Sequence, residues 1–254
     1  TLSCSSAASD VYKRQPSVSD VTITDADDGK TLDVSFTFSE AMDTGIAPTV
    51  TFDPAVASTL TGQSGAWQSD GKTFKVEATV ADKGVDADAV TIDIEGAKDA
   101  AGNLQVDHTA TVGLEVDTLN PEFTLEKAAS VAVDDIFSEF DVDTNPIVEL
   151  SGLSSDIDLV VVFVIGANAA DTVDADNVVG KEDGVIKKTY DLGSAVDGII
   201  SVPITQSDVN QLGQDGTEVF VRVTDVHGNT SVNNIGNLLI HTGTVLENEA
   251  GDVG

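Results

Sequence analysis

Aspartate is the residue type with the clearest chemical potential in this chain. Acidic residues number 44 and basic residues 12 among 254, a formal net charge of -32. Carboxylate oxygens are hard ligands that suit Ca²⁺. Two segments repeat one pattern of such oxygens, DAAGN from Asp99 to Asn103 and DVHGN from Asp225 to Asn229. Acidic segments at 25–29, 141–145 and 174–177 depart from EF-hand spacing, so polar turns explain them more simply.

The sequence gives little support to catalysis. His108, His227 and His241 lack the spacing of a zinc-protease helix, and we find no nucleophile elbow or glycine-rich phosphate loop. The single cysteine, Cys4, excludes a disulfide framework and a cysteine-based metal cluster. A glycosidase pair needs only two carboxylates, but solvated surface acids explain these residues more simply. We therefore expect no enzyme activity.

The acidic balance also excludes two classes of partner. Nucleic-acid binders need a basic surface, and proteins held at anionic membranes need polybasic segments. The longest apolar run, residues 159–165, is far shorter than the roughly 20 residues of a membrane-spanning helix. We expect neither nucleic-acid binding nor membrane insertion. Such acidity fits solubility in a saline habitat and also fits calcium-loaded repeats.

The first fifteen residues resemble a translated sequencing-library adapter. Residues 5–15, SSAASDVYKRQ, match a transposase adapter codon for codon. The segment has neither the charged start nor the apolar region of a secretion signal. We therefore leave residues 1–15 out of the fold and expect them to be disordered. We expect the genuine chain to begin at Pro16, as a metagenomic fragment from within a longer protein.

Alternating apolar and polar residues predict half-buried antiparallel strands. The alternation runs through residues 31–39, 73–80, 90–94 and 219–223. Turn-forming pairs separate such segments: Asp28-Gly29, Asp70-Gly71, Gly102-Asn103, Asp183-Gly184, Asp215-Gly216 and Gly228-Asn229. Many short strands at regular spacing favour β-sandwiches, so the predicted fold class is all-β.

Four further segments carry specific expectations. The apolar run 159–165 predicts a strand that is buried on both faces at the centre of a sheet. Residues 207–212 predict one helical turn with Ser207 as its cap. We expect Trp67 to pack between strands, and Arg222 to be an outward surface charge.

A weak internal repeat predicts two domains. The segments 99–103 and 225–229 each precede a predicted strand, and Pro16 and Pro121 each come just before one. We place domain 1 at residues 16–116, a linker at 117–120, domain 2 at 121–242, and a linker or truncated tail at 243–254. Such repetition is typical of tandem arrays.

The order of these motifs resembles the tandem bacterial immunoglobulin-like domains of large secreted surface proteins and repeat adhesins. The motifs are FSEAMD at 38–43, DAAGN at 99–103, VDTLNP at 116–121 and VRVTDVHGNTS at 221–231. Gly243 stands where domain 1 has Asp117, so domain 2 departs from the pattern at its end. The resemblance implies two tandem immunoglobulin-like β-sandwiches, an extracellular location at the bacterial surface, and calcium between domains.

The topology of a seven-strand sandwich predicts where the acids converge. Alternation between its two ends places the loops at 25–30 and 81–89 beside Asp117, and the last hairpin of domain 2 beside the start of that domain. Repelling carboxylates there would be cross-linked by a divalent cation. The predicted interdomain site comprises Asp27, Asp28, Asp82, Asp117, Asp225 and Asn229. A second predicted site, at the other end of domain 1, comprises Glu40, Asp43, Asp99 and Asn103. The alternative is turn chemistry with no ion.

These expectations favour a structural stalk or spacer for cell adhesion, with calcium-stiffened joints and neighbouring repeats of the same chain as partners. Two alternatives remain open. One is a carbohydrate- or protein-binding module, although Trp67 and Tyr190 are few and scattered for a sugar platform. The other is an accessory region of a secreted polysaccharide-degrading enzyme.

Overall fold

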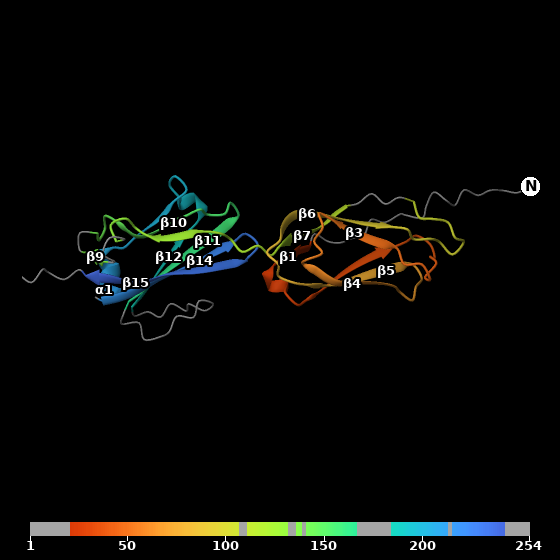
Figure 1. The fold of residues 1–254 in the computed structure, drawn as a ribbon, viewed down its shortest axis with the longest axis horizontal. Helices are drawn as coiled ribbons and strands as arrows, with labels where there is room; N and C mark the ends of the chain where they lie inside the picture. Colours follow the sequence, from red (N-terminus) through yellow and green to blue (C-terminus); the bar gives the residue numbers. More distant parts are fainter. Residues whose placement is uncertain are drawn as a thin grey trace, which may run out of the picture. The chain divides into compact units, whose positions relative to one another are not determined.

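The chain forms two compact units, which divide between Leu119 and Asn120. The computed structural model describes residues 21–106, 111–131, 136–138, 141–166, 184–212 and 215–241. The predictions for residues 1–15, His108, 174–177, Asp183 and 243–254 lie outside these ranges. Within them both units consist mostly of strands (Figure 1), so the all-β prediction is confirmed.

Unit 1 contains two sheets that share one core. The four-stranded sheet has the order β1-β7-β6-β3, and the three-stranded sheet has the order β2-β5-β4. The elements are β1 (Val21–Ile23), η2 (Asp25–Asp27), β2 (Thr31–Thr37), β3 (Thr49–Asp53), β4 (Leu60–Trp67), β5 (Thr73–Val80), β6 (Asp86–Glu95) and β7 (Thr111–Asp117). β1 and β7 pair in parallel, whereas all other pairs are antiparallel.

The predicted alternation in unit 1 is confirmed by burial. Phe36 of β2 and Phe74 of β5 face inward, where they join Ile92 of β6 in one apolar cluster. Trp67 closes the side of this core, with its ring centroid 5.2 Å from that of Phe74. Its indole Nε1 donates a hydrogen bond to the carbonyl oxygen of Ile46 at 2.8 Å. Packing between strands is therefore the structural role of Trp67.

Unit 2 adds strands to a similar plan. Its sheets have the orders β13-β10-β8 and β12-β11-β14-β15-β9, with β9 parallel to β15. The strands are β8 (Thr124–Lys127), β9 (Ile136–Ser138), β10 (Pro146–Ser151), β11 (Ile157–Ile165), β12 (Val185–Tyr190), β13 (Ile200–Pro203), β14 (Asp215–Asp225) and β15 (Thr230–His241). The helices are η3 (Leu192–Ser194) and α1 (Gln206–Leu212).

The apolar run in unit 2 forms the central strand that the sequence predicts. β11 lies between β12 and β14, and its residues 160–165 are all buried. Val162 faces the main core, whereas Phe163 belongs to a second apolar cluster on the opposite face. The Arg222 guanidinium lies 6.0 Å from the Phe163 ring centroid, so Arg222 packs on this cluster as well as carrying a surface charge.

Two local predictions are corrected. The helix α1 begins at Gln206, and its cap is Thr205 rather than Ser207. The Thr205 hydroxyl accepts from the Asp208 amide, and the Asp208 carboxylate accepts from the Thr205 amide, which is a reciprocal capping arrangement. Asp215-Gly216 is no turn, because both residues begin β14 and pair with β15.

No helix within the described ranges is long and apolar enough to cross a membrane. The helix α1 has seven residues, and it buries Val209 and Leu212 in the core of unit 2.

Candidate functional site

The two Asp-x-x-Gly-Asn segments occupy equivalent places in the two units. One lies in the connection from β6 to β7, and the other joins β14 to β15. In each unit these are the last two strands, and the last strand pairs in parallel with a strand near the start of the unit. The sequence repeat is therefore also a repeat of topology.

The side-chain hydrogen bonds of the two segments are the same. Oδ1 of Asp99 accepts from the backbone amides of Ala101 (2.9 Å) and Asn103 (2.8 Å), and Oδ2 accepts from Nδ2 of Asn103 (2.7 Å). Oδ1 of Asp225 accepts from the amides of His227 (2.8 Å) and Asn229 (3.0 Å), and Oδ2 accepts from Nδ2 of Asn229 (2.9 Å). We call these segments the Asp–Asn turns.

The backbone explains the glycine in the pattern. Gly102 has a φ of 91° and Gly228 a φ of 92°, a region that residues with a Cβ adopt only with strain. Their amides donate to the carbonyl oxygens of Asp99 and Asp225 at 3.0 and 3.2 Å. The Asp, Gly and Asn positions of the motif are thus each required by the turn itself.

These hydrogen bonds stabilise the carboxylate without an ion. The side chain of Asn103 and then its backbone amide lower the pKa of Asp99, because donors favour the charged form. A carboxylate offers about four lone-pair positions, and the turn uses three of them. The turn therefore accounts for Asp99 and Asn103 by itself, and metal binding there stays a prediction.

A third Asp–Asn pair follows the same principle, in the polar turn that the sequence favours over an EF-hand at residues 141–145. Oδ1 of Asp141 accepts from Nδ2 of Asn145 at 2.9 Å, while Oδ2 accepts from the amide (2.9 Å) and hydroxyl (2.7 Å) of Ser138. Burial by itself would raise the pKa of Asp141, but the hydrogen bonds from Ser138 and Asn145 lower it. The spacing of four residues from Asp to Asn is the shared signal.

Asp27 of the predicted interdomain set is already paired within unit 1. Its Oδ1 lies 2.9 Å from Nζ of Lys30, and its Oδ2 accepts from the amide of Thr24 at 3.1 Å. The hydrogen bond from Lys30, followed by the one from Thr24, lowers the pKa of Asp27. Asp27 therefore completes the capping box of η2, whose N-cap is Thr24, and forms an exposed ion pair.

The structure brings together Asp28 and Asp82. Oδ1 of Asp28 accepts from the amide of Asp82 at 3.0 Å, and Oδ1 of Asp82 accepts from the amide of Gly84 at 3.3 Å. The amide of Thr118 donates to the carbonyl of Val85 at 2.7 Å, which holds the end of β7 beside the same loop.

Asp117 closes β7, and its Oδ1 accepts from the amide of Leu119 at 3.1 Å. Asp27, Asp28, Asp82 and Asp117 belong to unit 1, whereas Asp225 and Asn229 belong to unit 2. A single site built from all six residues stays a prediction.

The predicted set at the other end of unit 1 is drawn from two adjoining segments. Met42 forms a β-bridge with Asp99, and the amide of Asp43 donates to the carbonyl of Lys98 at 2.8 Å. The Asp43 carboxylate accepts from the amide of Gly45 at 3.0 Å. Glu40 is half-buried in the same segment. These contacts place the segments side by side.

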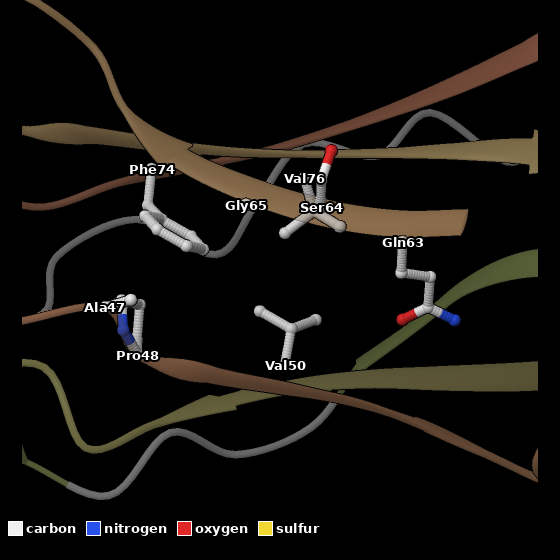
Figure 2. A pocket seen from close by; sticks show the side chains of 8 residues that line it. All are labelled: Ala47, Pro48, Val50, Gln63, Ser64, Gly65, Phe74 and Val76. Atoms are coloured by element: carbon white, nitrogen blue, oxygen red, sulfur yellow. The ribbon is translucent and has the colours of Figure 1, made fainter. Parts of the chain in front are cut away.

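A small cleft opens between β3 and β4, which are edge strands of the two sheets of unit 1 (Figure 2). Its volume is about 170 Å³, below the roughly 300 Å³ at which small-molecule sites begin. No titratable side chain lines it; the lining residues are Ala47, Pro48, Val50, Gln63, Ser64, Gly65, Phe74 and Val76. A Cβ at Gly65 would collide with the Phe74 ring, so Gly65 lets that ring fill the space. Ser64 supplies the one hydroxyl group of the cleft, and none of the lining residues is a base that could activate it.

Comparison with known proteins yields a structural likeness but no family. No family model matches the chain, and no curated protein matches it. Among solved structures, the chain is similar to one described as "Structural insight into host cell surface retention of a 1.5-MDa bacterial ice-binding adhesin". The identity is 14% and the TM-score 0.41, with 87% of this chain and 61% of that chain covered.

Proposed function

We propose that both units are immunoglobulin-like β-sandwich domains, repeated in tandem, and that they act as non-enzymatic spacers in a large bacterial surface adhesin. The observation that carries this proposal is the equivalent placement of the two Asp–Asn turns. A turn with the same hydrogen bonds lies between the last two strands of both units. A repeated element of this kind is expected of a domain copied along a chain.

The strand arrangement supports the immunoglobulin-like part of the proposal. In unit 1, the sheet β1-β7-β6-β3 corresponds to strands A′-G-F-C of such a sandwich, and the sheet β2-β5-β4 corresponds to strands B-E-D. In unit 2, β11 holds the position of strand C, and β12 extends its sheet beyond that strand. β8 is the additional strand of the other sheet, β13-β10-β8. Seven short strands with alternating burial are what this architecture requires.

The parallel pairs suit a mechanical role. β1 lies near the start of unit 1 and β7 ends it, and their register pairs Val21 with Leu114 and Ile23 with Val116. A force that separates the two ends of the unit pulls β1 and β7 in opposite directions along their length. This shears the hydrogen bonds between the two strands, which must then break together rather than one by one. β9 and β15 repeat the arrangement in unit 2.

A spacer needs no reaction chemistry, and the proposal therefore includes no enzyme activity. Such a role places the chain outside the cell, where its partners are neighbouring repeats of the same protein. The large negative charge fits this setting, because mutual repulsion keeps tandem domains soluble and apart.

Calcium is the second part of the proposal. At one end of unit 1 Asp28 and Asp82 adjoin, and the hydrogen bond from Thr118 to Val85 holds the residue after Asp117 beside the same loop, so negative charge collects there. We infer that Ca²⁺ binds there with the help of Asp225 and Asn229, and thereby stiffens the joint. Extracellular modules bind calcium with dissociation constants of about 10⁻⁴ to 10⁻³ M.

A calcium titration followed by thermal melting tests this proposal on residues 16–254. We expect millimolar Ca²⁺ to raise the melting temperature by several degrees, because a ligand of the folded state stabilises it. NaCl at matched ionic strength is the control for screening. Asp117→Ala should remove the calcium-dependent rise, and the quantity to compare is that rise, since the variant also loses its hydrogen bond to Leu119.

The opposite results are equally informative. A rise that NaCl reproduces would make the acids a solvated surface, and a rise that survives in Asp117→Ala would move the ion elsewhere. Either result removes calcium from the joint and leaves the binding-module alternative as the stronger one.

A further inference from the structure

Asp197-Gly198 differs from the two Asp-Gly pairs of unit 1, at Asp28 and Asp70. The two residues form the tip of a tight turn between η3 and β13, which is closed by hydrogen bonds between Val196 and Ile199 at 2.9 and 3.0 Å. All four residues are exposed. Both tip residues have positive φ, 52° for Asp197 and 78° for Gly198, as a type I′ turn requires. For Asp197 this conformation is uncommon.

In two other Asp-Gly pairs, the aspartate carboxylate and the glycine amide are both held by hydrogen bonds. The Asp70 carboxylate accepts from the amides of Lys72 and Thr73, both at 2.9 Å, and from the hydroxyl of Thr73 at 2.8 Å. The Gly71 amide is also engaged, since it donates to the carbonyl of Gln68 at 3.0 Å. Neither group at this pair is available for a reaction.

The first pair in unit 1 is held in a similar way. Oδ1 of Asp28 accepts from the amide of Asp82 at 3.0 Å, and the Gly29 amide donates to the carbonyl of Val80 at 2.9 Å. By contrast, the described part of the chain provides no hydrogen bond to the Asp197 carboxylate or to the Gly198 amide. These two groups face solvent, adjacent to one another.

We propose that Asp197 is a site of spontaneous isoaspartate formation. The Gly198 nitrogen attacks Cγ of the protonated Asp197 carboxyl group and loses its proton, the N–Cγ bond forms, and the Cγ–OH group leaves as water. The product is a five-membered succinimide. Water then adds and opens the ring at the N–Cγ bond, which restores aspartate, or at the bond to the main-chain carbonyl carbon, which gives isoaspartate. No oxidant or cofactor takes part.

The fold explains why this site is favoured. Gly198 has no Cβ to obstruct the ring, and nothing lies within 4 Å of the place where one would be. The exposed turn carries few contacts that resist the required rotation of Asp197. The product places an extra methylene in the main chain of a two-residue turn, next to β13 at the edge of its sheet. We therefore expect the change to remain local to this turn.

The test is ageing of the folded chain at 37 °C and neutral pH, followed by digestion with endoprotease Asp-N. This protease cleaves before aspartate but not before isoaspartate, so uncleaved Val196–Asp197 bonds report the product. Mass spectrometry compares sites 197, 70 and 28 in one sample. We expect site 197 to exceed both others several-fold in the folded protein, and the three to react at similar rates in urea.

Equal rates in the folded protein would overturn the proposal, and so would an excess at site 197 that persists in urea. The variant Asp197→Glu keeps the charge but would require a six-membered ring. Because Asp-N cleaves poorly before glutamate, the readout here is the second chromatographic peak of equal mass that isoaspartate gives for the peptide spanning position 197, and this peak should vanish in the variant. Because the turn is exposed, this variant should stay folded, with an unchanged circular dichroism spectrum. Persistence of the mass spectrometric signal in this variant would also contradict the assignment.

Discussion

β3 in unit 1 and β11 in unit 2 hold the same position, and their differences follow from one added strand. β3 pairs with β6 on one side only, whereas β11 lies between β14 and β12. The outward residues of β3 are polar, as in Thr51, whereas β11 carries Val161 and Phe163 outward with 2% and 1% exposure. An edge strand with one face in the core needs apolar residues on that face only. A central strand, flanked by a strand on each side, can bury apolar residues on both of its faces. The sequence pattern thus changes from alternation to a continuous apolar run.

The largest expected effect tests the outer face of β11. Phe163→Ala should destabilise unit 2 by about 3–5 kcal/mol, because a buried aromatic ring leaves a cavity. Thr51→Ala, on the outward face of β3, should change the stability of unit 1 by less than about 0.5 kcal/mol. Urea unfolding monitored by circular dichroism measures both variants. A cost below about 1 kcal/mol for Phe163→Ala would mean that the outer cluster is not a second core.

The next effect tests what the two units share. Asp225→Ala removes one carboxylate that accepts three hydrogen bonds, from the amides of His227 and Asn229 and from Nδ2 of Asn229. We expect a loss of about 1–3 kcal/mol in urea unfolding. Asp99→Ala should act in the same direction on unit 1. Asp158→Ala, an exposed residue on β11, is the matched control and should have no measurable effect. If Asp225→Ala behaves like this control, the Asp–Asn turn is no common stabilising device.

The smallest effect concerns the added strand itself. An ion pair connects β12 to α1: Nζ of Lys188 lies 2.8 Å from Oδ2 of Asp208. The Lys188 side chain is 20% exposed and the Asp208 side chain 17%. Burial by itself would raise the pKa of Asp208, but hydrogen bonds from Lys188 and Thr205 lower it below the ordinary 3.8. Lys188→Met should cost about 1 kcal/mol at neutral pH, at the upper end of the range for exposed pairs because both side chains are mostly buried.

The pH dependence of this pair has a defined sign. Because the folded pKa of Asp208 lies below its unfolded value, the stabilisation is complete above about pH 4. It is lost as the pH falls through the lowered folded pKa. The difference between the parent chain and Lys188→Met should therefore shrink below pH 4 in acid-unfolding curves. Lys187→Met, on the other face of β12, is the control; a similar pH dependence there would argue against the pair.

Much of the fold was predictable because burial imposes a period on the sequence. The alternation in β2, β5 and β14, and the apolar run of β11, directly record which faces are covered. The cap of α1 was missed because Thr205 pairs with Asp208, whereas the usual capping signal has Glu or Gln in that place. Asp215-Gly216 was misassigned because an Asp-Gly pair fits a strand start as well as a turn.

The candidate site was less predictable for a related reason. Sequence shows where carboxylates are but not which donors they meet. The hydrogen bonds that Asp99 receives from Asn103, and Asp27 from Lys30, appear only once the turns are formed. Spacing alone suits both a calcium ligand and a turn-forming aspartate.

The most direct test of the spacer account is small-angle X-ray scattering of residues 16–254 in millimolar Ca²⁺ and in chelator, at matched ionic strength. The account predicts a narrower distance distribution in Ca²⁺, because a cross-linked joint samples fewer arrangements. Circular dichroism should stay unchanged, since the domains themselves do not refold. Identical scattering curves at saturating Ca²⁺ would contradict a calcium-stiffened spacer.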